Sequence, residues 1–247
     1  MINLMEAETE ITIGKMVANN FRTAEVFRKY GIDFCCKGNR LLSTVCNDKN
    51  LDYNSIVQEL EHHIANKPVK SENDYKSMTP EELVNHIETV HHTYVRESIP
   101  TLMAYLAKIN KVHGENHPEL AEVYSLFEGC GNELAHHMMK EENILFPAIR
   151  KLALAEQNGQ EKVAPFFFGN LENPISMMEQ EHSAEGERFF KIADLTNNFT
   201  PPDDACTTYR VAFLKLEEFQ NDLFTHIHLE NNILFPKAFA IEQQLMS

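Results

Sequence analysis

Apolar residues recur at helical spacing through the first part of the chain. The segment 13–30, which stops before Gly31, carries them at Met16, Val17, Phe21, Ala24, Val26 and Phe27. A turn-rich patch, GIDFCCKGNR, follows, and a second helical pattern covers about 54–64. The next stretch, NKPVKSENDYKSMTP, is polar, contains two prolines and has no core-forming periodicity. We therefore predict a small helical domain over 1–66 and a linker over 67–77.

Longer amphipathic patterns fill the rest of the chain. They begin at Thr79-Pro80, where an N-cap threonine precedes a proline at the first helical position and acidic residues in the first turn. The predicted helices are 80–112, 118–157, 171–197 and 203–243. Low glycine, no tryptophan and few strand-like runs agree with an all-α protein. Four helices joined by short or moderate loops predict an up-down-up-down four-helix bundle over 78–247.

One short sequence motif occurs twice in the chain. HMMKEENILFP begins at His137 and HIHLENNILFP begins at His226. Each places a glutamate, Glu141 or Glu230, four residues after its histidine, and residues four apart share one face of a helix. We interpret the ILFP endings as core packing, with each proline bending the helix or marking a local irregularity.

Two further histidines complete a regular series along the bundle. Taking His92 and His182 with the repeated pair gives successive spacings of 45, 45 and 44 residues. In an antiparallel bundle, about 20 residues to a helix end, a short turn and about 20 residues back return to the same level. The four histidines are therefore predicted to converge on one layer. Equal height favours His92 over His91, and the repeat favours His137 over His136.

Four imidazoles and two carboxylates suit a binuclear metal site. Each ion would take two imidazoles, and Glu141 and Glu230 would bridge both ions and offset part of their charge. This donor set favours iron, manganese or zinc over calcium or magnesium. The chain repeats itself because each half of the bundle holds half of one site. The other histidines of the bundle are interpreted as surface or core groups: His86, His91, His113, His117, His136 and His228.

Several acids lie close to these histidines in sequence. Glu133 and Asp222 each stand four residues before a repeated histidine, and Glu181 adjoins His182. They are candidates for orienting imidazoles or carrying protons. They are equally compatible with solvated helix surfaces, which are rich in acids in this chain.

Charge and cysteine content narrow the partners and the compartment. The formal charge of −15 disfavours nucleic-acid or anionic-membrane partners. No apolar run reaches the roughly 20 residues of a membrane helix, and the acidic N-terminus does not resemble a secretory signal. Five cysteines without a disulfide framework suit a reducing compartment, so a cytoplasmic location is expected.

The vicinal thiols Cys35 and Cys36 are candidates for chemistry. Beside Lys37 in a turn they are expected to be exposed and reactive, because positive charge favours the thiolate; the alternative is a pair of buried small hydrophobes. A stable structural disulfide between them is not expected, because adjacent cysteines close a strained ring. The remaining cysteines are assigned to packing: Cys46, Cys130 and Cys206.

Taken together, these stretches resemble a known family. The segments HHMMKEENILFP, MMEQEHSAEGE, TPPDDACTT and HIHLENNILFP are similar to the hemerythrin-like domain, and FRKYGIDFCCKGN is similar to the short cysteine-bearing domain of the bacterial RIC (repair of iron centres) family. The resemblance implies two iron ions with an oxo or hydroxo bridge, bridging carboxylates at Glu141 and Glu230, and a homodimer. The implied iron-binding histidines are His92, His137, His182 and His226.

The same resemblance implies a function. Family members restore iron–sulfur clusters damaged by nitrosative or oxidative stress, so damaged iron–sulfur proteins would be the clients, engaged with the help of Cys35 and Cys36. Two mechanisms remain open: non-enzymatic donation of iron, and reduction of bound nitric oxide to nitrous oxide. A sensor of oxygen or nitric oxide is less favoured, because no output domain is recognised. Oxygen-carrying hemerythrins have a further histidine where this chain has Gly186, so room for an exogenous ligand is expected and a plain oxygen carrier is not.

Overall fold

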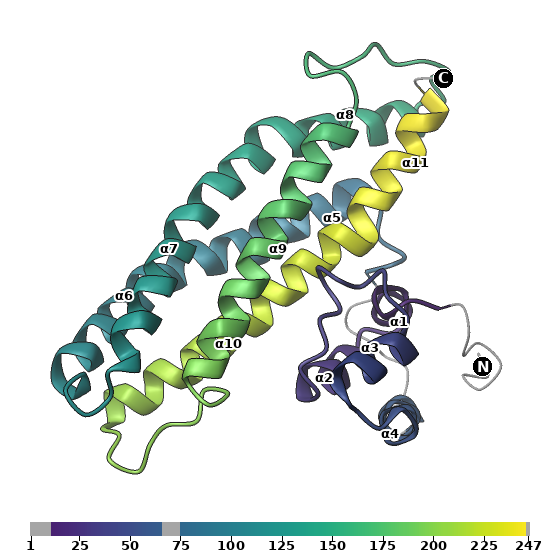
Figure 1. Ribbon diagram of the computed structural model, residues 1–247. Helices are drawn as coiled ribbons and strands as arrows, with labels where there is room; N and C mark the ends of the chain where they lie inside the picture. Colours follow the sequence, from purple (N-terminus) through teal and green to yellow (C-terminus); the bar gives the residue numbers. More distant parts are fainter. Residues whose placement is uncertain (1–10, 66–74, 246–247) are drawn as a thin grey trace.

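The computed structural model describes residues 11–65 and 75–245, and over these ranges the protein is helical (Figure 1). The β-pairing in the same ranges is limited to two isolated bridges, Thr12 with Leu41 and Phe166 with Gly169. The predicted all-α class is confirmed. Within the described part of the chain, no helix combines the length and apolar character needed to cross a membrane.

Four long rods form the bundle, and three of them contain a π-helical segment (η). The first rod is α5 (Pro80–His86), η1 (Ile87–His92) and α6 (Thr93–His113). The second is α7 (Glu119–Lys140), η2 (Glu141–Leu145) and α8 (Phe146–Gln157). The third is α9 (Glu172–Leu195), and the fourth is α10 (Thr207–Leu229), η3 (Glu230–Leu234) and α11 (Phe235–Leu245).

The rods close into a ring. Helix α6 packs against α7 and α10, and α9 packs against the same two helices. Successive rods run in opposite directions, as Figure 1 shows, so the predicted up-down-up-down bundle is confirmed. The predicted start of the first bundle helix is also confirmed. Thr79 Oγ1 accepts from the Glu82 backbone N–H (3.2 Å), and Glu82 Oε2 accepts from the Thr79 N–H (2.7 Å).

The small domain consists of α1 (Ile13–Asn19), α2 (Thr23–Lys29), α3 (Leu42–Lys49) and α4 (Tyr53–Ala65). The single helix predicted over 13–30 is wrong, because the chain turns at Asn20. Asn20 is extended, its side chain accepts from the Arg22 N–H (3.2 Å), and its carbonyl accepts from Thr23 Oγ1 (2.8 Å). Such local side-chain bonds compete with helix continuation. Helix α3 was not predicted.

The small domain lies against the middle of the fourth rod, where α1 contacts α10 and η3 (Figure 1). Residues 67–74 of the predicted linker lie outside the described residues. Tyr75, near its end, is buried and packs edge-on against Phe21 at 5.6 Å between ring centroids. The domain boundaries themselves stay a prediction.

Two apolar clusters divide the bundle interior. One contains Leu134 and Met138 of α7 together with the small domain's core, and the other contains Leu145 of η2 and Ile149 of α8. Between these levels the second rod buries His137 and Glu141. A polar layer therefore interrupts the hydrophobic interior at one height.

Candidate metal centre

All six residues predicted to bind metal meet in this polar layer. Each is at most 3% exposed. The histidines lie near the ends of η1, α7 and α10 and in the middle of α9, and the two glutamates begin η2 and η3. We call them the six-residue cluster: His92, His137, Glu141, His182, His226 and Glu230. The equal-height argument is therefore confirmed as a statement about position, while metal binding by these residues stays a prediction.

The π-helical turns explain how the repeat shapes this layer. The Phe146 N–H bonds the Glu141 carbonyl, and the Phe235 N–H bonds the Glu230 carbonyl, each five residues back rather than four. The next residue in each copy is proline, which has no N–H to continue the helix ladder. The irregularity predicted for the ILFP endings is confirmed, and it begins at the glutamate in both copies.

The phenylalanine of each ILFP ending packs on a histidine of the cluster. The Phe146 ring lies 5.7 Å from that of His92 with an interplanar angle of 16°, and the Phe235 ring lies 6.3 Å from that of His182 at 5°. Both phenylalanines are fully buried. The interpretation as core packing is confirmed for the buried residues of the two endings, Leu145, Phe146, Ile233, Leu234 and Phe235, but it is wrong for Ile144, which is 38% exposed. The packing of the two phenylalanines fixes the planes of two imidazoles.

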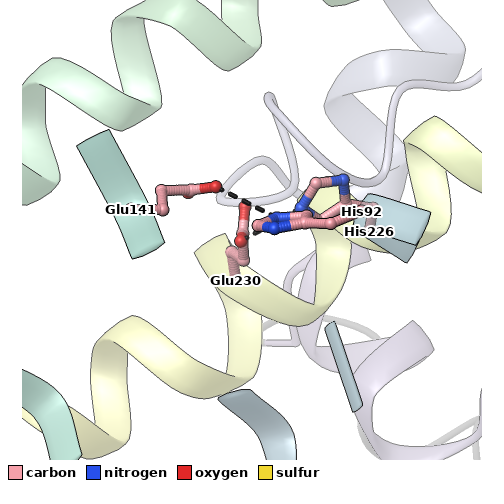
Figure 2. A group of neighbouring side chains, drawn as sticks. All are labelled: His92, Glu141, His226 and Glu230. Atoms are coloured by element: carbon pink, nitrogen blue, oxygen red, sulfur yellow. Dashed lines mark hydrogen bonds and ion pairs between the residues drawn. The ribbon is translucent and has the colours of Figure 1, made fainter. Parts of the chain in front are cut away.

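The cluster divides into two overlapping sets of four. The first set contains His92, Glu141, His226 and Glu230, and the second contains His137, Glu141, His182 and Glu230. In each set, the ligand atoms lie within 4.8 Å of one another. Figure 2 shows the carboxylates and imidazoles of the first set pointing toward one another. Both glutamates belong to both sets.

Each glutamate directs one oxygen to each set. Glu141 Oε2 lies 3.3 Å from His92 Nε2, and its Oε1 lies 3.2 Å from His137 Nε2. Glu230 Oε1 lies 3.1 Å from His226 Nε2, and its Oε2 lies 3.0 Å from His182 Nε2. This division of oxygens is what two bridging carboxylates require.

Buried atoms without partners show that the layer fits cations. Both oxygens of Glu141, one oxygen of Glu230 and His92 Nε2 are inaccessible to solvent and have no aligned hydrogen bond. Buried charge without such partners is costly unless a counter-ion is present. Two atoms that each lie about 2.1 Å from one ion, at right angles, are about 3.0 Å apart, which matches the contacts between imidazole nitrogens and carboxylate oxygens.

Hydrogen bonds on the outer side of the rings set their orientation. His92 Nδ1 donates to Glu142 Oε1 (2.7 Å), His137 Nδ1 to Glu181 Oε2 (2.8 Å) and His182 Nδ1 to Asn231 Oδ1 (2.8 Å). With the proton held on Nδ1, the lone pair of Nε2 faces the layer. Three of the four imidazoles are thus held in the form that binds a metal.

Two of these partners were missed in the sequence. Glu142 and Asn231 each follow a repeated glutamate directly, and each bonds a histidine of a neighbouring rod. Their matching places in the two copies were the available signal. Glu181 was a candidate, but its partner is His137 on α7 rather than the adjacent His182.

The other two acidic candidates have different surroundings. Glu133 is exposed and lines a cavity of about 100 Å³ that also borders His137 and His182. Asp222 Oδ1 accepts from His91 Nδ1 (2.9 Å), and the His91 ring stacks on His226 at 5.5 Å. Asp222 is therefore connected to His226 through His91, a buried neighbour of the cluster.

The charges of the layer are mutually dependent. Burial alone lowers the pKa of His137, but the nearby Glu141 carboxylate and the hydrogen bond to Glu181 outweigh it and raise the pKa to about 10. The hydrogen bond from His137 lowers the pKa of Glu181 to about 2. Burial raises the pKa of Glu230, yet His226 and His182 hold it well below the ordinary value. Without bound cations, protons on histidine balance the carboxylates.

The two vicinal cysteines differ from the expectation. Cys35 is buried, Cys36 is half-buried, and burial raises the pKa of Cys35 well above its ordinary value. The predicted exposure of Cys35 is therefore wrong. Lys37 pairs instead with Glu187 of α9 (3.4 Å).

Cys36 lies next to the third rod, beside Gly186. Cys36 Sγ lies 3.3 Å from the backbone carbonyl oxygen of His182, and a Cβ added at Gly186 would be 3.2 Å from the same sulfur. Cys36 thus occupies the space beside Gly186, while the expectation that the metal has room for an exogenous ligand stays a prediction. Among the cysteines assigned to packing, Cys46 and Cys130 are buried. Cys206 is exposed at the N-cap of α10, so its assignment to packing is wrong.

Removing the Glu142 carboxylate tests the orienting bonds. In Glu142→Ala the His92 ring loses its Nδ1 partner, and we expect metal affinity to fall about 10- to 100-fold. The measurement is the metal dissociation constant from competition with a chromophoric chelator. Glu97→Ala removes an exposed acid of α6 and serves as the control. Equal dissociation constants for the two variants would show that the bond to Glu142 is unimportant.

A four-helix bundle with a buried layer of histidines around two shared glutamates is the arrangement of a hemerythrin-like protein. The family model for the hemerythrin HHE cation binding domain matches residues 83–238, and a model for a domain of unknown function, DUF542, matches residues 9–64. The iron-sulfur cluster repair proteins YtfE of Escherichia coli O8 (strain IAI1) and Escherichia fergusonii are each 36% identical to this chain over 230 residues. These alignments cover 93% of this chain and 97% of each relative. The chain belongs to the RIC family of hemerythrin-like iron–sulfur cluster repair proteins.

Proposed function

We propose that this protein holds two iron ions and repairs iron–sulfur clusters damaged by nitrosative or oxidative stress by supplying iron from this labile centre. The observation that supports a binuclear centre most directly is the pair of four-residue sets that share Glu141 and Glu230. The repair role is supported by the names of the relatives, which are 36% identical over almost their whole length. Damaged iron–sulfur proteins are the clients in this proposal.

Each residue of the cluster has a defined role in holding iron. His92 and His226 would hold one ion, and His137 and His182 the other. The glutamates would give one oxygen to each ion, with the oxo or hydroxo bridge that the family resemblance implies. Imidazole and carboxylate donors suit iron. When bound, the pair would supply ferrous iron and one-electron redox chemistry.

The wall of the layer gives the centre a connection to solvent. The cavity of about 100 Å³ borders three histidines of the cluster and is also lined by Glu133, Glu185 and Arg188. Glu133 is exposed, so the cavity's border extends from solvent to the buried layer. A cation or a small ligand would reach the centre at this place, past acidic side chains that attract cations.

Reactivation of a damaged enzyme tests the repair function. Iron-loaded, reduced protein is mixed without oxygen with a [4Fe–4S] hydratase that nitric oxide has inactivated. We expect hydratase activity to return while iron leaves the binuclear centre. An equal concentration of ferrous salt, with a chelator that binds free iron, is the control. Absence of reactivation, with iron retained throughout, contradicts the proposal.

Reduction of nitric oxide is the second candidate function. The cavity beside His137, His182 and His226 has the size for small ligands, which favours nitric oxide as a ligand of this centre. An enzyme of this kind releases more than one nitrous oxide per centre in the presence of a reductant, whereas stoichiometric product contradicts turnover. A sensor is the third candidate, and a stable signalling partner would support it. The homodimer and the cytoplasmic location stay predictions from the sequence and the family resemblance.

A further inference from the structure

The two vicinal thiols are brought together by a side chain of their own loop. In an extended chain, neighbouring side chains point to opposite faces. Here Asp33 Oδ1 accepts from the backbone N–H groups of Cys35 (3.1 Å) and Cys36 (2.9 Å), which bends the chain. The two sulfurs consequently lie 3.6 Å apart on the same side, and both cysteines are free thiols.

The same carboxylate completes a group of three potential ligands. Cys35 Sγ lies 3.4 Å from Asp33 Oδ1, and the ligand atoms of Asp33, Cys35 and Cys36 are all within 4.8 Å of one another. Two thiolates about 2.3 Å from one tetrahedral ion are separated by about 3.8 Å. The observed sulfur separation of 3.6 Å is close to that value, so little movement is needed to place one ion between them.

The fourth rod and α1 hold this loop, residues 33–38, in place. Asn231 Nδ2 and Asn232 Nδ2 both donate to the Cys35 carbonyl, at 3.3 Å and 3.2 Å. The Gly14 N–H donates to the Gly38 carbonyl (2.7 Å), and a Cβ at either glycine would lie 3.0 Å or less from Asn232 Oδ1. The ligand group is therefore ordered by protein contacts before any ion binds, which lowers the entropic cost of binding.

We propose that Asp33, Cys35 and Cys36 form a second cation site, a mononuclear site for a thiophilic divalent ion such as Fe²⁺, Zn²⁺ or Co²⁺. Two sulfur donors favour these ions over Mg²⁺, Ca²⁺ and Mn²⁺. As each sulfur–metal bond forms, the proton of that thiol passes to solvent, so no oxidant or reductant is needed. Three protein ligands leave a fourth position for water or for a thiolate of another protein.

The second site and the binuclear centre share one wall. Cys36 Sγ lies 3.3 Å from the carbonyl oxygen of His182, whose imidazole belongs to the cluster. Asn231 joins them again, because it accepts from His182 Nδ1 and donates to the Cys35 carbonyl. An acceptor for iron that leaves the binuclear centre is thus in place. That use rests on the proposed function, whereas the existence of the site does not.

Cobalt titration tests the site because the six-residue cluster contains no sulfur. The reduced, metal-free full chain is titrated with Co²⁺ under argon. We expect three ions per chain and, with one of them, a near-ultraviolet thiolate-to-cobalt charge-transfer band. Cys36→Ser is expected to lose this band and keep two ions. Asp33→Asn keeps an oxygen that can accept the hydrogen bonds of the loop's N–H groups but loses the charge. It is expected to lower the affinity for the ion that gives the band at least about tenfold.

Two further variants separate this proposal from its alternatives. Cys46→Ser changes a buried cysteine of α3 and should leave the band unchanged, which excludes a general effect of removing a thiol. The double variant Glu141→Gln, Glu230→Gln should keep the band while losing the other two ions, so failure of the binuclear centre is distinguishable from failure of this site. No band in the parent chain, or a band that persists in both Cys36→Ser and Asp33→Asn, overturns the proposal.

Discussion

Replacing both shared glutamates, Glu141→Gln with Glu230→Gln, is expected to abolish binding of both metal ions and to leave the helical fold intact. Glutamine has nearly the same volume, so the packing of the layer is retained. Its amide is neutral and a poor ligand, and each set of four loses both anionic donors at once. Metal analysis of the protein as isolated should show that the variant carries two fewer iron ions per chain than the parent, with unchanged circular dichroism.

The single variants show whether the glutamates bridge. Glu141 directs one oxygen to each set. Glu141→Gln should therefore lower the affinity for both ions together, rather than abolish binding of one ion and leave the other unchanged. Glu242→Gln is the matched control, because Glu242 is a buried acid of the fourth rod that lies in the apolar half and accepts from the Leu171 N–H (2.8 Å). Two tightly bound ions in the double variant contradict the assignment of these ligands.

The bundle and the six-residue cluster were predictable because both appear in the sequence as residues at regular helical spacing. A histidine and a glutamate four apart fix a shared helix face without knowledge of any other helix. The spacings from His92 to His226 then depend only on the lengths of the helices and of the loops that join them, 114–118, 158–171 and 196–206. Local periodicity and the antiparallel topology were enough to place these side chains at one height.

The surroundings of the cluster depend on contacts between distant segments, which no local pattern encodes. Glu181 was selected because it precedes His182, yet it bonds His137 across the bundle. Cys36 reaches His182 from 146 residues away, and its burial follows from docking of the small domain. The break at Asn20 was missed for a different reason, because two side-chain bonds there override an otherwise continuous helical pattern.

Raising the pH from 6.5 to 10 is expected to destabilise the metal-free protein more than the iron-loaded protein. The pKa of His137 is about 10 in the folded chain against an ordinary value of 6.5, because Glu141 and Glu181 outweigh the effect of burial. A raised folded-state pKa contributes stability that is fully present below 6.5 and is lost as the pH rises through 10. From this group alone the slope is at most about 1.4 kcal/mol per pH unit.

Bound iron removes that dependence, because His137 Nε2 then carries a metal rather than a proton. Thermal unfolding of both forms at several pH values between 6.5 and 10 measures the difference, and parallel curves would contradict the assignment of His137. Glu181→Gln removes one source of the raised pKa, so the metal-free protein should lose less stability in total over this pH range. At acid pH the sign reverses: the depressed pKa of Glu230 contributes stability that is present above 4.5 and is lost as the pH falls through the folded value. The metal-free layer is therefore most stable when its histidines hold the protons and its glutamates do not, and binding of two cations replaces those protons at the same nitrogens.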